Sequence, residues 1–121
     1  MIKSYLEAIN LTLEKMMDKD ENIFLIGEDI GINGGCFGVT ARLFEKYGEK
    51  RVVNSPMCEQ SLIGTGIGAA IAGLKPVVEI MFMDFMGLAY DQLLNHAGIF
   101  SYLSNGDISV SVFCRFRMDV V

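Results

Sequence analysis

Short apolar runs alternate with helical segments along this chain, and this alternation restricts the possible folds more than any other feature of the sequence. Runs with the length and composition of strands lie at residues 23–26, 51–54, 77–82 and 108–114. Helical patterns lie at residues 5–17, 41–47, 61–72 and 88–102. Strands that alternate with helices form βαβ units. We therefore predict a three-layer α/β fold, with helices on both faces of a mostly parallel sheet of about four strands.

Local signals mark the ends of the predicted helices. Ser4 and Glu7 have the spacing of a capping box, which predicts that the first helix begins at this point. Gly48 and Gly73 follow the second and third predicted helices, at the position where glycine commonly ends a helix. In parallel α/β sheets, ligands bind beyond the carboxyl ends of the strands. The segments at 27–29 and 55–59 have this placement and are therefore the candidate site segments.

Composition narrows the class of protein. Acidic residues outnumber basic ones by 15 to 10 in a chain of 121 residues, which argues against a nucleic-acid partner. No apolar run reaches the ~18 residues needed to cross a bilayer, so we expect no membrane association. Three separated cysteines fit neither a disulfide framework nor a zinc site, which favours a cytoplasmic protein with reduced thiols. A hydrophobic content of 51% predicts that a partner, or a part of the protein that this chain lacks, covers some of the surface.

The glycine-rich run at residues 64–68 has two interpretations. A dinucleotide-binding loop requires its glycines at the turn from a strand into a helix. Here the glycines fall inside the predicted helix, which favours close packing against a neighbouring backbone, either in the same chain or in a second copy. We therefore expect self-association through the helix at residues 61–72.

Glu59 is the most informative single acid. It stands at the start of a helix, where the helix dipole alone favours a negative charge. Its apolar neighbours also suit a carboxyl group that exchanges protons with a ligand, and both interpretations stay open at this point. Glu28 follows the first strand, where an acid is more often a solvated loop residue or a cap than part of a paired-carboxylate site. Phe85 follows the third strand, where an aromatic ring belongs either to the core or to a planar ligand's site.

Several segments together resemble a known family, the beta subunit of the E1 component of 2-oxo acid dehydrogenase complexes. They lie at residues 27–31, 34–37, 55–59, 64–82, 84–85 and 91–95, and residues 55–59 read Ser-Pro-Met-Cys-Glu. Pyruvate, branched-chain and acetoin dehydrogenases share this pattern. The resemblance implies that residues 1–115 form the N-terminal part of a transketolase-like pyrimidine-binding domain. Residues 116–121 resemble nothing in the family and are expected to be a divergent tail.

The resemblance also implies chemistry with thiamine diphosphate. Glu59 matches the catalytic glutamate that hydrogen-bonds ring nitrogen N1′ and promotes ylide formation. Phe85 matches a ring that stacks on the pyrimidine, Met57 matches a residue that lines its pocket, and Glu28 matches an acid near the reacting end. An alpha-type E1 subunit is expected to hold the diphosphate and its Mg²⁺, so no metal site is expected in this chain. Decarboxylation and acyl transfer to lipoyl-E2 would follow.

An alternative function stays open beside the enzyme. Beta subunits of this family are much longer than 121 residues, and they continue after the strand at 108–115 with a further loop and a second domain. This chain would then be a truncated, non-catalytic remnant or an interaction protein that retains the fold.

Overall fold

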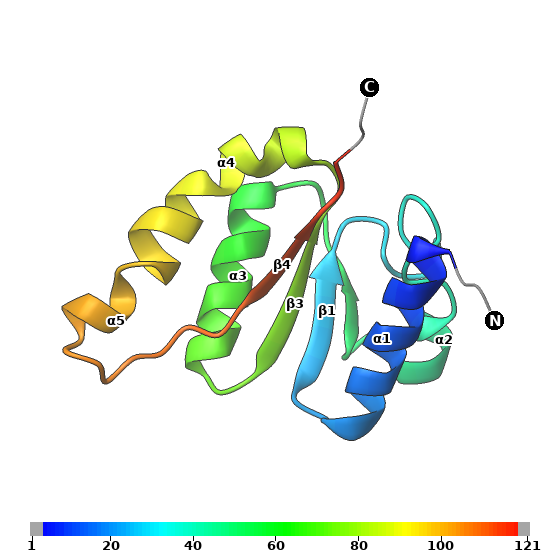
Figure 1. Cartoon of the computed structure of the whole chain (residues 1–121), viewed down its shortest axis with the longest axis horizontal. Coiled ribbons are helices and arrows are strands. Elements are labelled where there is room, and N and C mark those ends of the chain that lie inside the picture. Colours follow the sequence, from blue (N-terminus) through cyan, green and yellow to red (C-terminus); the bar gives the residue numbers. More distant parts are fainter. Residues whose placement is uncertain (1–3, 119–121) are drawn as a thin grey trace.

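A parallel sheet forms the centre of the computed structural model, which describes residues 4–118 (Figure 1). Within these residues the strands are β1 (Ile23–Gly27), β2 (Val52–Asn54), β3 (Lys75–Ile80) and β4 (Phe113–Phe116). Their order across the sheet is β2-β1-β3-β4, and every neighbouring pair is parallel. The predicted α/β class and the four-stranded parallel sheet are confirmed.

Helices cover both faces of this sheet. Helices α1 (Tyr5–Lys19) and α2 (Leu43–Tyr47) lie on one face, and α3 (Glu59–Ile71) and α4 (Met86–Asp91) lie on the other (Figure 1). Side chains alternate between the faces of a strand, which divides the core into two clusters. Leu25 packs in the cluster on the α1 side, whereas the next residue, Ile26, packs in the cluster on the α3 side.

Helix α1 begins at the predicted capping box. The Ser4 Oγ accepts a hydrogen bond from the Glu7 N–H at 3.2 Å, and the Glu7 carboxylate accepts one from the Ser4 N–H at 2.8 Å. These bonds satisfy amide donors that have no partner within the helix itself. The local sequence signal was therefore sufficient to place this helix start.

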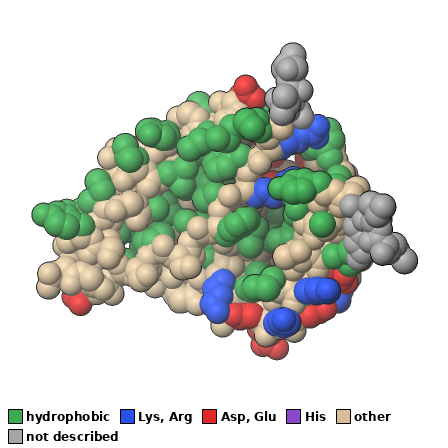
Figure 2. Space-filling view, in the orientation of Figure 1, with side chains coloured by type: hydrophobic (Ala, Val, Ile, Leu, Met, Phe, Trp, Pro, Cys, Tyr) green, Lys and Arg blue, Asp and Glu red, His purple; other side chains and the backbone are tan. Residues whose placement is uncertain are grey.

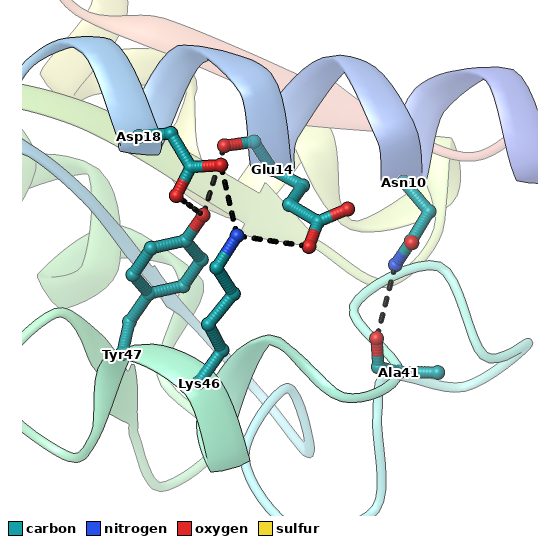
Figure 3. A network of polar contacts seen from close by, with 6 residues as sticks. All are labelled: Asn10, Glu14, Asp18, Ala41, Lys46 and Tyr47. Carbon is teal, nitrogen blue, oxygen red and sulfur yellow. Dashed lines mark hydrogen bonds and ion pairs between the residues drawn. The ribbon is translucent and has the colours of Figure 1, made fainter.

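Polar side chains tie α1 to α2 across the surface (Figure 3). The Lys46 Nζ lies 3.0 Å from a Glu14 carboxylate oxygen and 2.8 Å from one of Asp18. The Tyr47 hydroxyl donates to Asp18 at 2.7 Å, and the Asn10 amide donates to the Ala41 carbonyl at 3.2 Å. These contacts hold the short helix α2, and the loop before it, against α1.

Helix α3 begins two residues earlier than predicted, at Glu59 rather than Ser61. Cys58 is the N-cap residue, with non-helical φ −163° and ψ 85°. All three glycines of the run at 64–68 lie inside this helix. Their place in the helix interior agrees with the packing interpretation rather than with a dinucleotide-binding loop.

The single helix predicted at 88–102 is wrong. The structure has a 3₁₀-helix η1 (Met83–Phe85), then α4, a π-helix η2 (Gln92–Ala97) and α5 (Phe100–Leu103). The Gly98 N–H bonds the carbonyl of Leu93, five residues back, which widens the turn. A Cβ at Gly98 would lie 2.9 Å from the Leu94 carbonyl oxygen, so glycine allows this close approach. Periodicity alone did not reveal the wider turn.

Strand β4 is shorter than the predicted strand at 108–114, and it begins only at Phe113. The register pairs Phe113 with Val77 of β3, so Val112 lies next to the level of Pro76. Proline has no N–H to donate to a ladder. Strand β3 begins at Lys75, two residues before its predicted start and at the level of Ser111, so residues 108–110 have no partner on β3.

Candidate functional site

The sheet has a switch point between its two central strands. The chain leaves β1 toward β2 at one edge, then crosses over β1 to place β3 on its other side. Ligands of such sheets bind beyond the carboxyl ends of the strands at this point. Glu28 follows β1, Met57 and Glu59 follow β2, and Phe85 follows β3. The topology thus directs all four predicted site residues to the same edge of the sheet.

Glu28 is a buried carboxyl group with an incomplete set of partners. The residue is only 5% exposed, and its Oε1 is buried without a hydrogen-bond partner among the described residues. Burial raises the pKa of Glu28, the Glu59 carboxylate raises it further, and the backbone N–H of Cys58 opposes both effects. An unpaired buried acceptor is costly, which favours binding of a donor at this place.

Glu59 is the first residue of α3 and is half-buried. Its carboxylate acts on the pKa of Glu28, so residues 31 positions apart in the sequence form one electrostatic pair. The Glu59 charge makes the Glu28 carboxyl group hold its proton more readily, because two neighbouring negative charges repel each other. The arrangement can therefore accept or share a proton with a ligand.

The loop after β1 is held in place by contacts at several points. A Cβ at Gly27 would lie 2.8 Å from the Glu79 carbonyl oxygen on β3, so only glycine fits there without a shift. The Asn54 Oδ1 accepts a hydrogen bond from the Gly31 N–H at 3.2 Å. The Thr40 hydroxyl donates to the Ile30 carbonyl at 2.9 Å. The Gly31–Asn54 contact joins the loop beside Glu28 to the end of β2, and the other two hold β1 against β3 and fix the loop itself.

An aromatic row lies beyond the end of β3. The rings of Phe37 and Phe82 meet edge to face at 6.2 Å between centroids, and those of Phe82 and Phe85 meet at 6.1 Å. The Arg117 guanidinium lies 3.1 Å from the Phe37 ring centroid, in cation–π contact. Phe85 keeps 38% of its surface exposed and is available for stacking. Phe37 could not be singled out from the sequence, because no local pattern of residues indicates which ring it meets.

The four predicted site residues have different surroundings at this edge of the sheet. The structure brings Glu28 and Glu59 together as an electrostatic pair. It places Met57 on the surface, 83% exposed, and holds Phe85 against Phe82. Asn54 and Cys58 also contact the site, and both lie within or beside the segment that follows β2. Their position at the end of the strand or shortly after it was the one signal available in the sequence.

Two hollows lie away from the carboxyl pair, between α1 and β4. Their volumes are about 790 Å³ and about 390 Å³, and both are lined by Leu13 and Phe113. Arg115 lines the larger hollow and also forms an ion pair with the buried Glu79 of β3, at 2.8 Å. Figure 2 shows hydrophobic side chains gathered across the middle of this face of the molecule. This apolar surface agrees with the high hydrophobic content of the sequence.

Comparison with protein families gives one match over nearly the whole chain. Residues 3–119 match the family described as transketolase, pyrimidine binding domain. This match includes every strand, the carboxyl pair and the aromatic row.

Comparison with curated proteins gives relatives that are named as dehydrogenase beta subunits. The 2-oxoisovalerate dehydrogenase subunit beta of Bacillus subtilis is 41% identical over 94% of this chain and 35% of its own length. The pyruvate dehydrogenase E1 component subunit beta of Acholeplasma laidlawii is 44% identical with the same coverage. That of Cyanidium caldarium is 43% identical over 90% of this chain and 33% of its own length. The chain thus spans about a third of the length of these relatives.

Proposed function

The chain belongs to the transketolase pyrimidine-binding domain family, and from this premise we propose that it is the cofactor-binding segment of a beta-type 2-oxo acid dehydrogenase E1 subunit. The resemblance predicted from the sequence is confirmed by relatives named as E1 beta subunits or as the beta subunit of 2-oxoisovalerate dehydrogenase. The boundary between residues 1–115 and a tail at 116–121 stays a prediction.

The buried, unpaired oxygen of Glu28 is the observation that carries this proposal. It stands at the switch point of the sheet and has no donor among the described residues. The aminopyrimidine part of thiamine diphosphate is flat, carries amino hydrogens and has a weakly basic ring nitrogen. An acceptor at Glu28, a second carboxyl at Glu59 and an aromatic ring at Phe85 fit such a group. In this proposal Met57 supplies an apolar contact.

Each residue then has a distinct task. Glu59 hydrogen-bonds ring nitrogen N1′ and shares a proton with it, as general acid–base catalysis requires. Glu28 accepts a hydrogen bond near the reacting end, and its raised pKa allows it to hold a proton there. Phe85 orients the ring by stacking. Thiamine diphosphate, when bound, supplies the electron sink that decarboxylation of a 2-oxo acid requires.

The proposal includes partners, because this segment alone would hold only part of the cofactor. An alpha-type E1 subunit would bind the diphosphate and Mg²⁺, and lipoyl-E2 would accept the acyl group. The exposed apolar side chains between α1 and β4 support assembly of some kind. The alternative of a non-catalytic remnant makes the opposite prediction, that mixing with an alpha-type subunit gives no turnover.

Self-association through the helix at 61–72 is part of the proposal as well. Gly68 supports it, since no atom would lie within 4 Å of a Cβ there, and another helix could approach closely. Two of the three glycines face inward instead: Gly66 packs on Val78 and Gly64 on Gln92. The proposed contact is therefore confined to the outer side of α3.

We also propose a cytoplasmic location, which rests on the cysteine pattern of the sequence. Among the described residues, no helix is long and apolar enough to cross a membrane. The printed names of two Arabidopsis thaliana relatives place those proteins in the chloroplast.

Glu59→Gln tests the function directly. The variant is placed in a full-length beta chain and assembled with an alpha-type subunit, thiamine diphosphate and Mg²⁺. We expect decarboxylation to fall by about two to four orders of magnitude, because the amide can contact N1′ but cannot share a proton with it. Circular dichroism checks that the fold is retained, which we expect because a helix start tolerates a neutral polar residue.

Glu45→Gln, which removes an exposed acid from α2, is the matched control and should leave turnover unchanged. Equal turnover in the Glu59→Gln and unmodified assemblies would remove Glu59 from the mechanism. The 121-residue chain is assayed in parallel with the same alpha-type subunit. Absence of both assembly and turnover in that arm would favour the remnant.

A further inference from the structure

Cys58 lies close to both carboxyl groups of the site, and we propose that it is a peroxide-sensitive modification site. It is the N-cap residue of α3, and its backbone N–H interacts with the Glu28 carboxylate while Glu59 follows it in the chain. The consequence for cofactor binding rests on the proposed function, whereas the reactivity of the thiol does not.

The surroundings of the thiol favour its reactive form. Cys58 is exposed, and its Sγ lies 3.1 Å from the Ser61 Oγ, which can donate a hydrogen bond to a thiolate. The Ser61 hydroxyl and then the Ser61 backbone N–H lower the pKa of the Cys58 thiol. Thiols at helix N-termini are commonly activated in this way, because unpaired amides and the helix dipole stabilise the negative charge.

Charged groups that face the thiol act in the opposite direction. The Glu59 and Glu28 carboxylates both raise the pKa of Cys58, but they do not cancel the effect of Ser61. Burial raises the pKa of Glu28 itself and so favours its neutral form. The carboxyl pair therefore opposes thiolate formation least when Glu28 holds a proton.

The unpaired oxygen of Glu28 is a second, independent indication that a small molecule binds here. One side of this carboxyl group meets the Cys58 N–H, and the buried Oε1 has no donor among the described residues. The Glu28 charge also acts on the Cys58 thiol, so this carboxyl group, which is only 5% exposed, lies close to the sulfur.

The reaction is a two-electron oxidation of sulfur. The Cys58 thiolate attacks one oxygen of hydrogen peroxide, an S–O bond forms and the O–O bond breaks. The products are a sulfenic acid on Cys58 and hydroxide, which takes up a proton to give water. Sulfur is oxidised and peroxide is reduced. The new S–OH group adds bulk and polarity directly beside Glu59.

The chain contains its own reference thiols. Cys36 is exposed like Cys58 but lies in the glycine-rich loop before α2. Cys114 is half-buried on β4, and burial raises the pKa of its thiol. The three thiols therefore separate the effect of exposure from the effect of the local environment.

Alkylation by iodoacetamide at neutral pH, followed by peptide mass spectrometry, measures the three thiols in one sample of the whole chain. Each rate is divided by the rate of the same thiol in urea. We expect Cys58 to react several-fold faster than Cys36, and Cys114 to react slowest. Ser61→Ala should reduce the rate of Cys58, whereas Ser101→Ala on α5 is the matched control. Equal rates for Cys58 and Cys36, or no effect of Ser61→Ala, would overturn the proposal.

Dimedone trapping after brief exposure to hydrogen peroxide tests the oxidation itself. The adduct is expected on Cys58 and largely absent from Cys36, and equal labelling would contradict the proposal.

A separate experiment uses the full-length assembly with the alpha-type subunit. There, peroxide should reduce the turnover of the unmodified assembly by a larger factor than that of Cys58→Ser. If peroxide reduces the turnover of both assemblies equally, oxidation of Cys58 does not affect the proposed cofactor site. The labelling result, which concerns only the reactivity of the thiol, would be unaffected.

Discussion

At the scale of single residues, substitutions at Gly66 and Gly68 distinguish the effect of packing on stability from the effect of helix propensity. A Cβ at Gly66 would lie 2.5 Å from the Cγ2 of the buried Val78, whereas a Cβ at Gly68 would meet nothing within 4 Å. We expect Gly66→Ala to destabilise the chain by about 1–3 kcal/mol through overpacking. Gly68→Ala should stabilise it by about 1 kcal/mol, because alanine is the better helix former. Urea denaturation measures both, and equal stability of the two variants would contradict the packing of α3.

Glu28 gives a prediction about pH at the same scale. Its pKa is raised above the ordinary value of 4.5, mainly by burial. Between the ordinary and the raised pKa, the folded chain binds more protons than the unfolded chain, so its stability falls as pH rises through this window. Glu28→Gln removes this contribution.

As pH rises above 4.5, the unmodified chain should therefore lose unfolding free energy relative to Glu28→Gln. Denaturation at a series of pH values measures it. Glu59→Gln should narrow the pH range over which stability changes, since the Glu59 charge is the second cause of the raised pKa of Glu28. A difference that does not change with pH would show that Glu28 titrates normally.

At the scale of elements, the contact between α1 and α2 depends on Lys46. Hydrogen bonds from Lys46 and then Tyr47 lower the pKa of Asp18 below its ordinary value of 3.8. The stabilisation is present above 3.8 and is lost as pH falls through the lowered pKa of the folded chain. We expect Lys46→Met to raise the titration midpoint of Asp18 in a carboxyl NMR experiment. Lys50→Met, at an exposed position after α2, is the control, and an unchanged midpoint in Lys46→Met would exclude the contact in solution.

At the scale of the whole molecule, exposed apolar side chains predict association. Leu88, Leu94 and Tyr102 on the helices after β3 are each more than half exposed, as is Phe113 on β4. We expect sedimentation velocity to show species larger than a monomer as concentration rises. Gly68→Glu should shift this equilibrium toward the monomer, because a charged side chain blocks close approach of another helix. Lys50→Gln, which changes the net charge by the same amount as Gly68→Glu, is the control. A chain that stays monomeric at high concentration would contradict self-association through α3.

The sequence by itself determined the α/β class, the parallel sheet, the start of α1 and the family. Strand length, helical periodicity and the capping box at Ser4 are local properties, so they can be read without knowing which segments meet. The same reasoning predicted that Glu28 and Glu59 lie at one edge of the sheet, because the carboxyl ends of parallel strands share an edge.

Only the tertiary structure decided the contacts between segments far apart in the chain. The interrupted helix after η1 depends on a wide turn at Gly98, and the late start of β4 depends on Pro76 of another strand. The Cys58 N–H beside Glu28, and Phe37 against Phe82, likewise join distant segments. Such contacts depend on distances of a few ångströms between strand ends. Those distances follow from sheet register and helix packing, which no local pattern of residues specifies.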